Sequence, residues 1–266
     1  MAINIIILFI LGLFYGSLFM KIGFRTPQNI PVVTKSRCDS CSNDLSLFEQ
    51  IPLVSYIIQR GKCKHCGSKI GAAYPIVELM TGILFVLTYY SFYEFENPFF
   101  QVLLGLIFVS SLIIIMIADI KYMLIPNKIL LVFTLLVLFL KLFIGINNKE
   151  LTSFMDIGYE VIIMAIDAII MFVIMFIIKK LGKIVFKKEA LGGGDVKMMA
   201  YIAMLLGYKI SIVIIFFASF IALPVFIYNA LKKSETMLPF GPFLAIATLI
   251  LYLAKIDFDT LLSLIK

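Results

Sequence analysis

Residues 99–119 read FFQVLLGLIFVSSLIIIMIAD, an apolar run that ends in an aspartate. The run is long enough to cross a bilayer, which takes roughly 20 such residues in a helix. Near the other end of the chain, residues 191–197 read LGGGDVK and lead into another apolar run. An ionisable side chain at the edge of a membrane is costly, so Asp119 and Asp195 predict chemistry carried out at that edge.

The composition is that of a membrane protein. Hydrophobic residues make up 62% of the 266 residues, and the mean hydropathy of +1.07 is far above that of a soluble domain. We expect an all-α polytopic membrane protein with about eight transmembrane helices. The predicted spans are 4–20, 75–93, 99–118, 129–146, 158–178, 196–207, 210–230 and 240–254.

One long polar stretch interrupts this pattern soon after the first span. We therefore divide the chain into a first transmembrane helix (1–23), a small cytosolic domain inserted after it (24–74), and a transmembrane domain (75–266).

The placement of positive charge predicts the orientation. With the N-terminus outside, the predicted inside segments are 21–74, 119–128, 179–197 and 231–239. They carry 18 of the 23 lysines and arginines, as the positive-inside rule requires. Both Asp119 and Asp195 then lie on the cytosolic side. Because the net charge of +7 is shared among several loops, it predicts no nucleic-acid partner.

Four cysteines lie in the polar stretch, as the pairs Cys38-x2-Cys41 and Cys63-x2-Cys66. Two pairs with this spacing can supply four thiolates to one tetrahedral Zn2+. Two disulfides or four free thiols are the alternatives, and a reducing cytosol disfavours the disulfides. A zinc ion with four protein ligands has no open position. We therefore predict a structural site, which a domain of this size needs in order to fold.

The histidine content limits the catalytic options. His65, between two cysteine ligands, is the chain's one histidine. We interpret it as a bystander to the metal. A Ser-His protease needs a histidine on a membrane helix, and an H-E-x-x-H metalloprotease needs two. A pair of acids is therefore the main option for proteolysis. Asp167, near the middle of its span, is expected to be a structural polar group.

The glycines before Asp195 strengthen its candidacy as a catalytic residue. Three consecutive glycines remove side-chain bulk, so an extended substrate could approach the carboxylate. The apolar run that follows places Asp195 at a helix N-terminus, where a negative charge is favoured. A triglycine can also serve merely as a flexible hinge.

At this point the chain resembles a known family. LGGGDVK at 191–197 is similar to the G-x-G-D motif of intramembrane aspartyl peptidases, and the whole chain resembles the type IV prepilin peptidases. Further similar motifs appear in the family's order. They are GLFYGS at 12–17, IPLVSY at 51–56 between the cysteine pairs, YPIVELMTG at 74–82, Asp119 with Pro126 downstream, and PFGP at 239–242.

The resemblance implies a bifunctional enzyme of the bacterial cytoplasmic (inner) membrane. Such enzymes cut the basic leader from type IV prepilins or pseudopilins at the cytosolic face, and Asp119 and Asp195 match the catalytic pair. Many then methylate the new N-terminus with S-adenosylmethionine. Glu78, at the membrane junction, is a candidate contributor to that cofactor's site or simply an interfacial acid. The alternatives are a peptidase without methyl transfer, an ion-coupled transporter and a non-catalytic scaffold.

Overall fold

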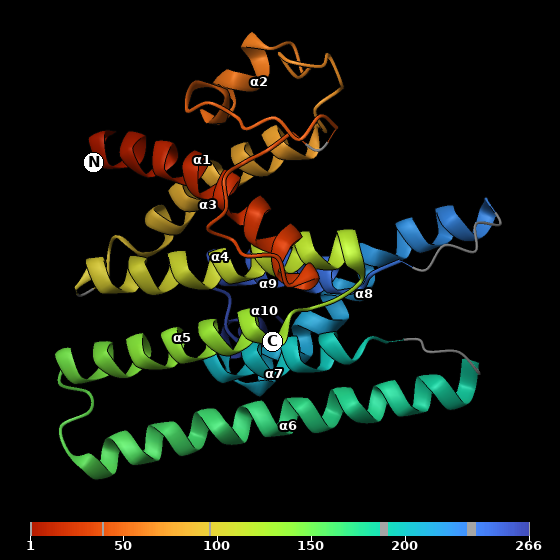
Figure 1. The fold of residues 1–266 in the computed structure, drawn as a ribbon. Helices are drawn as coiled ribbons and strands as arrows, with labels where there is room; N and C mark the ends of the chain where they lie inside the picture. The colour runs from red at the N-terminus through yellow and green to blue at the C-terminus, as the bar shows by residue number, and fades with distance from the viewer. Residues whose placement is uncertain (1, 39, 96, 187–190, 233–237, 266) are drawn as a thin grey trace. The chain divides into compact units, whose positions relative to one another are not determined.

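The computed structural model describes residues 2–38, 40–95, 97–186, 191–232 and 238–265, and helices occupy nearly all of the apolar sequence (Figure 1). The α-helices are α1 (Ala2–Arg25), α2 (Val54–Ile58), α3 (Ala73–Phe92), α4 (Pro98–Tyr122), α5 (Asn127–Asn147), α6 (Phe154–Phe186), α7 (Gly193–Leu206), α8 (Tyr208–Leu231), α9 (Gly241–Leu253) and α10 (Phe258–Ile265). Short 3-10 helices span Thr26–Gln28 (η1) and Phe48–Gln50 (η2). The described ranges hold no β-strand, only two isolated β-bridges. The predicted all-α membrane fold is confirmed.

Within these ranges, six helices are long and apolar enough to cross a membrane: α1, α3, α4, α5, α6 and α8. The runs predicted at 196–207 and 240–254 form α7 and α9, which have 14 and 13 residues. At about 1.5 Å per residue, each is roughly 20 Å long and falls short of a hydrocarbon core of about 30 Å. The predicted count of eight spans is therefore not confirmed. Parts of two predicted inside segments, 187–190 and 233–237, lie outside the described residues.

The chain divides into two compact units, Met1–Tyr90 and Ser91–Lys266. In the first unit, α1 and α3 come into close contact through small residues. A Cβ atom on Gly12 would lie 2.6 Å from the Cα atom of Gly82, and one on Gly16 would lie 2.7 Å from the Cα atom of Glu78. Small residues let two membrane helices approach backbone to backbone, which gains van der Waals contact where apolar burial alone cannot drive association.

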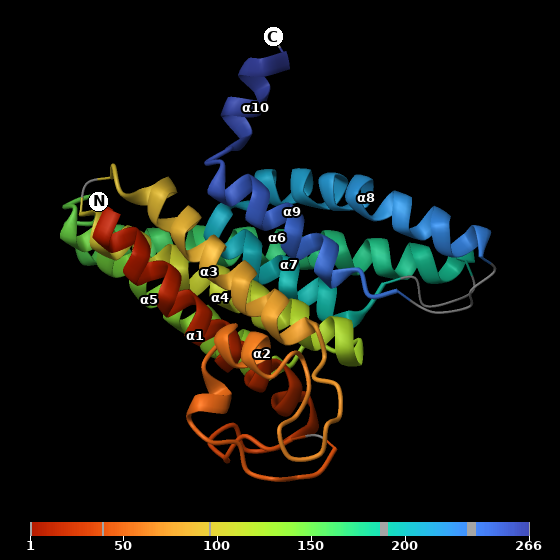
Figure 2. The same ribbon diagram turned by 90° about the horizontal axis from the view of Figure 1, so that it is seen from above.

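The second unit is built around α4. In its most apolar window, 67% of the helix is buried, against 28% or less in the other five candidate spans. α4 packs against α5 and α9, and α6 runs along α7 (Figure 1). Phe108, Leu112 and Ile115 of α4 have no exposed surface. The short helix α10 projects away from the end of α9 (Figure 2). The helix that carries Asp119 is therefore the most buried of the candidate spans.

The contact between α1 and α3 gives a first testable prediction. Gly12→Ala places a methyl group against backbone that cannot move aside, so we expect a loss of about 1–3 kcal/mol in stability, as in other overpacked cores. Gly158→Ala, in α6, is the matched control because nothing lies within 4 Å of its added Cβ. The measurement is the thermal unfolding midpoint of each purified variant in one detergent. Equal midpoints for both variants would contradict the close approach of α1 and α3.

Candidate active site and cysteine cluster

Asp119 lies in the last turn of α4, where the helix is stopped by a change in backbone direction. Met123 adopts a left-handed conformation (φ 51°), and its N–H donates to the Asp119 carbonyl at 2.8 Å. Pro126 then precedes α5 in an extended conformation. The Asp119 side chain is only 6% exposed. The break that the sequence predicts after Asp119 thus places this acid at a helix end within the protein interior.

Asp195 lies in the first turn of α7, as predicted. It occupies the third helical position after the N-cap residue Gly192, and its Oδ2 accepts the Gly192 N–H at 3.1 Å. An acid at this position satisfies an amide that the helix itself leaves unpaired, and the helix dipole favours its negative charge. The side chain is 5% exposed. Local sequence alone therefore fixes the direction of this carboxylate.

Each of the three glycines before Asp195 faces a different neighbour. A Cβ on Gly192 would lie 3.1 Å from Oδ2 of Asp195, and one on Gly193 would lie 3.2 Å from Nζ of Lys179. A Cβ on Gly194 would lie 2.9 Å from the Cβ of Ile125, in the segment between α4 and α5. Close packing therefore requires a glycine at position 194, while the neighbour of Gly193 is the flexible end of a side chain.

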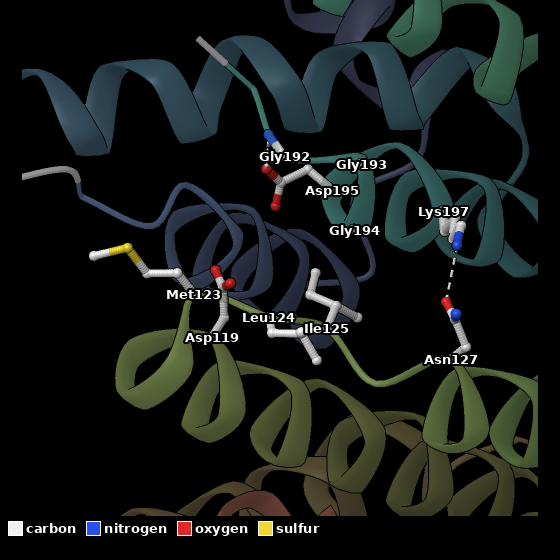
Figure 3. A pocket seen from close by; sticks show the side chains of 10 residues that line it. All are labelled: Asp119, Met123, Leu124, Ile125, Asn127, Gly192, Gly193, Gly194, Asp195 and Lys197. Carbon is white, nitrogen blue, oxygen red and sulfur yellow. Dashed lines mark hydrogen bonds between the residues drawn. The ribbon is translucent and has the colours of Figure 1, made fainter. Parts of the chain in front are cut away.

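The two predicted aspartates are brought together, although they are 76 positions apart along the chain (Figure 3). Both carboxylates approach one point, the position that a Cβ on Gly241 would take. Oδ2 of Asp119 lies 2.5 Å from it and Oδ1 of Asp195 lies 3.2 Å from it. Oδ2 of Asp119 is buried and has no hydrogen-bond partner among the described residues. Two buried carboxylates that approach one point disfavour double ionisation, which favours the pair with a single proton.

A cavity of about 370 Å3 opens beside the pair. Its lining residues are Asp119, Met123, Leu124, Ile125, Asn127, Gly192, Gly193, Gly194, Asp195 and Lys197. Lys197 spans part of it and donates to the Asn127 amide oxygen at 2.9 Å, which ties the start of α5 to α7 (Figure 3). The glycines expose backbone along one wall, and apolar side chains form the other. Such a cavity suits an extended peptide.

Two further membrane acids have other neighbours. Asp167, in α6, has its Oδ2 3.8 Å from the Cβ position of Gly207, at the junction of α7 and α8. Glu78, in α3, is buried, and its Oε2 accepts the Leu53 N–H at 2.8 Å. Leu53 has a left-handed φ of 60°. The Glu78 carboxylate thus anchors the polar segment of the first unit to α3.

The four cysteine thiols gather into one cluster in the first unit. Their Sγ atoms all lie within 4.8 Å of one another, and those of Cys38 and Cys66 are 3.9 Å apart. Four thiolates at about 2.3 Å from a central zinc would be separated by about 3.8 Å. Backbone amides of Cys41 and Ser40 lower the pKa of Cys38 to about 6, whereas burial and the neighbouring thiols raise the pKa of Cys41 to about 11, so the thiols interact strongly with one another. The cluster therefore fits a tetrahedral metal ion.

The two cysteine pairs lie in matching turns. Cys38 donates its N–H to the Asn43 carbonyl and accepts the Ser42 N–H, while Cys63 does the same with Ser68 and Gly67. The residue four positions after each first cysteine is left-handed, with φ of 59° at position 42 and 71° at position 67. One β-bridge closes each turn. Such repeated turns point backbone amides at the sulfur atoms.

His65 is not a member of the thiol cluster. Its Nε2 lies 3.4 Å from Oε1 of Glu49. The other Glu49 oxygen accepts both the N–H and the hydroxyl of Ser46, each at 2.8 Å, and these bonds lower the pKa of Glu49. An ionised Glu49 gives the imidazole an alternative partner to a metal.

Two family models match the chain in succession. The Bacterial Peptidase A24 N-terminal domain matches residues 10–92, and the Type IV leader peptidase family matches residues 106–227. A Bacillus subtilis (strain 168) protein named prepilin leader peptidase/N-methyltransferase is 32% identical, with 93% of each chain covered. The chain belongs to the prepilin leader peptidase family. The recognition made from its motifs is confirmed.

Other relatives carry the same name. The Vibrio cholerae relative is 28% identical over 94% of this chain and 96% of its own, and the Dichelobacter nodosus relative is 29% identical over 81% and 70%. No solved structure matches the chain. These relatives favour a peptidase over the transporter and scaffold alternatives.

The sequence does not predict that PFGP at 239–242 contributes to the aspartate pair. It shows the motif, but nothing in it indicates that Gly241 lies against Asp195 and Asp119, which are 46 and 122 positions earlier in the chain. The Lys197–Asn127 bond was likewise not predicted. The sequence marks Gly241 and Lys197 only as members of motifs that occur in the family's order.

The glycine contacts predict unequal effects of adding one methyl group. Gly194→Ala meets the branched carbon of Ile125, which cannot rotate away, whereas Gly193→Ala meets the flexible end of Lys179. Overpacking of about 1–3 kcal/mol beside the aspartate pair would lower peptide cleavage by about ten- to a hundredfold in Gly194→Ala. Gly193→Ala is its matched control and should lose less than about threefold. Initial cleavage rates at equal enzyme concentration test this, and equal losses would contradict it.

Proposed function

We propose that this protein is a prepilin leader peptidase in which Asp119 and Asp195 form the catalytic pair. The observation that carries the proposal is the convergence of two buried carboxylates on one point beside a cavity with a glycine wall. Membership of the leader peptidase family supports the same reaction class. Neither a serine nor a zinc protease of the types considered above fits a chain with a single histidine.

The reaction follows from one proton shared by two acids. The ionised carboxylate accepts a proton from a water molecule as that water's oxygen attacks the scissile carbonyl carbon. The protonated carboxyl donates its proton to the carbonyl oxygen. When the tetrahedral intermediate collapses, the C–N bond breaks and the leaving amine takes up a proton. Because the pair titrates as a unit, we assign neither Asp119 nor Asp195 a fixed role.

The substrate that we propose is the leader of a type IV prepilin or pseudopilin, cut at the cytosolic face of the bacterial cytoplasmic membrane. The C-terminal end of α4 meets the N-terminal end of α7 at the cavity, so both acids belong to the same end of their unit. The distribution of lysine and arginine favours the cytosol for that end, with the N-terminus outside. A basic leader would approach from the same compartment.

We propose methyl transfer as the second activity, with S-adenosylmethionine as the donor and the newly exposed N-terminal amine as the acceptor. The support is the shared name of relatives that match most of this chain. The acceptor nitrogen is part of an amide until the scissile bond is cut, so cleavage must precede methyl transfer. The role of Glu78 that we favour is structural, because its carboxylate already holds the Leu53 amide.

For the polar domain, 24–74, we propose a single structural zinc ion bound by Cys38, Cys41, Cys63 and Cys66. The support is the fit of the thiol cluster to tetrahedral geometry and the two matching turns. With four protein ligands, the ion would have no position for water or substrate, so its contribution would be to the folding of the domain.

Substitution of either aspartate tests the catalytic assignment. Asp119→Asn and Asp195→Asn each remove the shared proton, and we expect cleavage of a co-expressed prepilin to fall by more than about a thousandfold. Mass spectrometry of the product, with S-adenosylmethionine present, reads both activities: loss of the leader, then a gain of one CH2 on the new N-terminus. Wild type should show both.

Asp167→Asn is the matched control, since it removes a membrane acid outside the cavity. It should cleave at the wild-type rate. Normal processing by Asp119→Asn or Asp195→Asn would refute the proposed pair. Cleavage by wild type without the mass gain would reduce the function to that of a peptidase.

The zinc proposal predicts one metal ion per chain. Cys63→Ser should lower the zinc content measured by elemental analysis to below about a fifth of the wild-type value, because three ligands bind far more weakly than four. It should also expose residues 24–74 to limited proteolysis. His65→Ala, a change between two ligands, is the control and should retain the full zinc content. Equal zinc loss from His65→Ala would make the histidine a ligand.

A further inference from the structure

We infer that the N-terminus of α9, at Gly241, is a positioning element that holds the carboxylate of Asp119 against that of Asp195. This inference rests on the proposed function, since it concerns the same pair of acids. It gives the PFGP motif at 239–242 a role in that site.

The first support is steric. Gly241 is the first residue of α9, and its missing side chain leaves the space in which the two carboxylates meet. A Cβ there would lie 2.5 Å from Oδ2 and 3.2 Å from Cγ of Asp119, and 3.2 Å from Oδ1 of Asp195. Real Cβ atoms essentially never lie under 3.0 Å from a neighbouring atom. Any side chain at this position would therefore displace Asp119, and glycine is required by the approach of the acids.

The second support comes from the hydrogen bonds of the backbone N–H groups in the first turn of α9. Pro242 has no N–H to donate. The N–H groups of Phe243 and Leu244 both donate to the Phe240 carbonyl, at 3.0 and 3.2 Å. The Gly241 N–H is therefore the amide of residues 241–244 that makes no bond within the first turn, and it belongs to the residue whose Cβ position lies 2.5 Å from Oδ2 of Asp119.

The third support is electrostatic. Asp119 lies in the last turn of α4, where the helix dipole and the terminal carbonyls disfavour a carboxylate. Its Oδ2 is buried without a hydrogen-bond partner, and its side chain is 94% buried. The N-terminus of α9 supplies the opposite dipole at the same carboxylate. Asp195 does not need a second helix to stabilise its charge. It lies in the first turn of its own helix, α7, and accepts the Gly192 N–H.

These three supports assign different tasks to the helices at the pair. α4 and α7 carry the acids, while α9 carries none. Its N-terminus provides the glycine gap and a helix dipole that favours a negative charge on Asp119. Moving that carboxylate by about 1 Å would misalign it with the scissile carbonyl, which can cost about a hundredfold in rate.

Gly241→Ala tests the inference. We expect kcat for leader cleavage to fall by about a hundredfold, with KM within about threefold of wild type, because the displaced acid binds no part of the ground-state substrate. Methylation of a pilin supplied already cleaved should proceed at the wild-type rate, which separates a positioning role from a folding defect. Gly158→Ala, with open space around it, is the matched control and should cleave normally.

A second measurement needs no activity. Asp119→Cys combined with Gly241→Cys should form a disulfide on mild oxidation, since the side chain of one reaches the Cβ position of the other. Peptide mapping by mass spectrometry detects the link. Asp119→Cys combined with Gly158→Cys is the control pair and should form none.

The outcomes separate the two proposals. Normal cleavage by Gly241→Ala, equal losses of cleavage and methyl transfer, or no disulfide at 119–241 would each overturn the role of α9 while Asp119→Asn stays inactive. Normal cleavage by Asp119→Asn would overturn the proposed function itself. A disulfide together with a selective loss of kcat supports the positioning role.

Discussion

The burial of two carboxylates side by side is the constraint on which the arrangement of the second unit depends. Each charge is costly away from water, and the closeness of the acids adds repulsion. Helix N-termini are the available compensation: Asp195 accepts an amide at the start of α7, and Oδ2 of Asp119 lies close to Gly241 at the start of α9. Both of these short helices therefore begin beside the acids.

The sequence predicted those features that local chemistry determines. Three glycines before an acid and an apolar run after it indicate a helix start, and α7 begins at Gly193. A proline-containing break after Asp119 indicates a helix end, and α4 ends at Tyr122. The number of spans was not predictable in the same way, because hydropathy marks α7 and α9 as apolar but does not show that they begin at a buried site.

Contacts between distant segments required the structure. The role of the triglycine as a packing surface depends on Ile125 and Lys179, which lie in other elements. The approach of Gly241 to both acids depends on where α9 begins, and no periodicity or spacing fixes that point. The cysteine cluster is the opposite case. Each Cys-x2-Cys pair lies in one short turn, and the two turns match. The spacing of the cysteines in the sequence therefore indicated that four sulfur atoms gather around one point.

Three glycines make room at the aspartate pair because they carry no side chain. Gly192 clears Asp195, Gly194 clears the segment after α4, and Gly241 clears the space between the acids. A larger residue at any of these positions adds few contacts, because the space is already taken by a carboxylate or by Ile125. A methyl group on Gly192 or Gly241 would instead have to be accommodated by moving an acid, and one on Gly194 by moving Ile125. The position of the two carboxylates therefore limits the side chains that the surrounding backbone can carry.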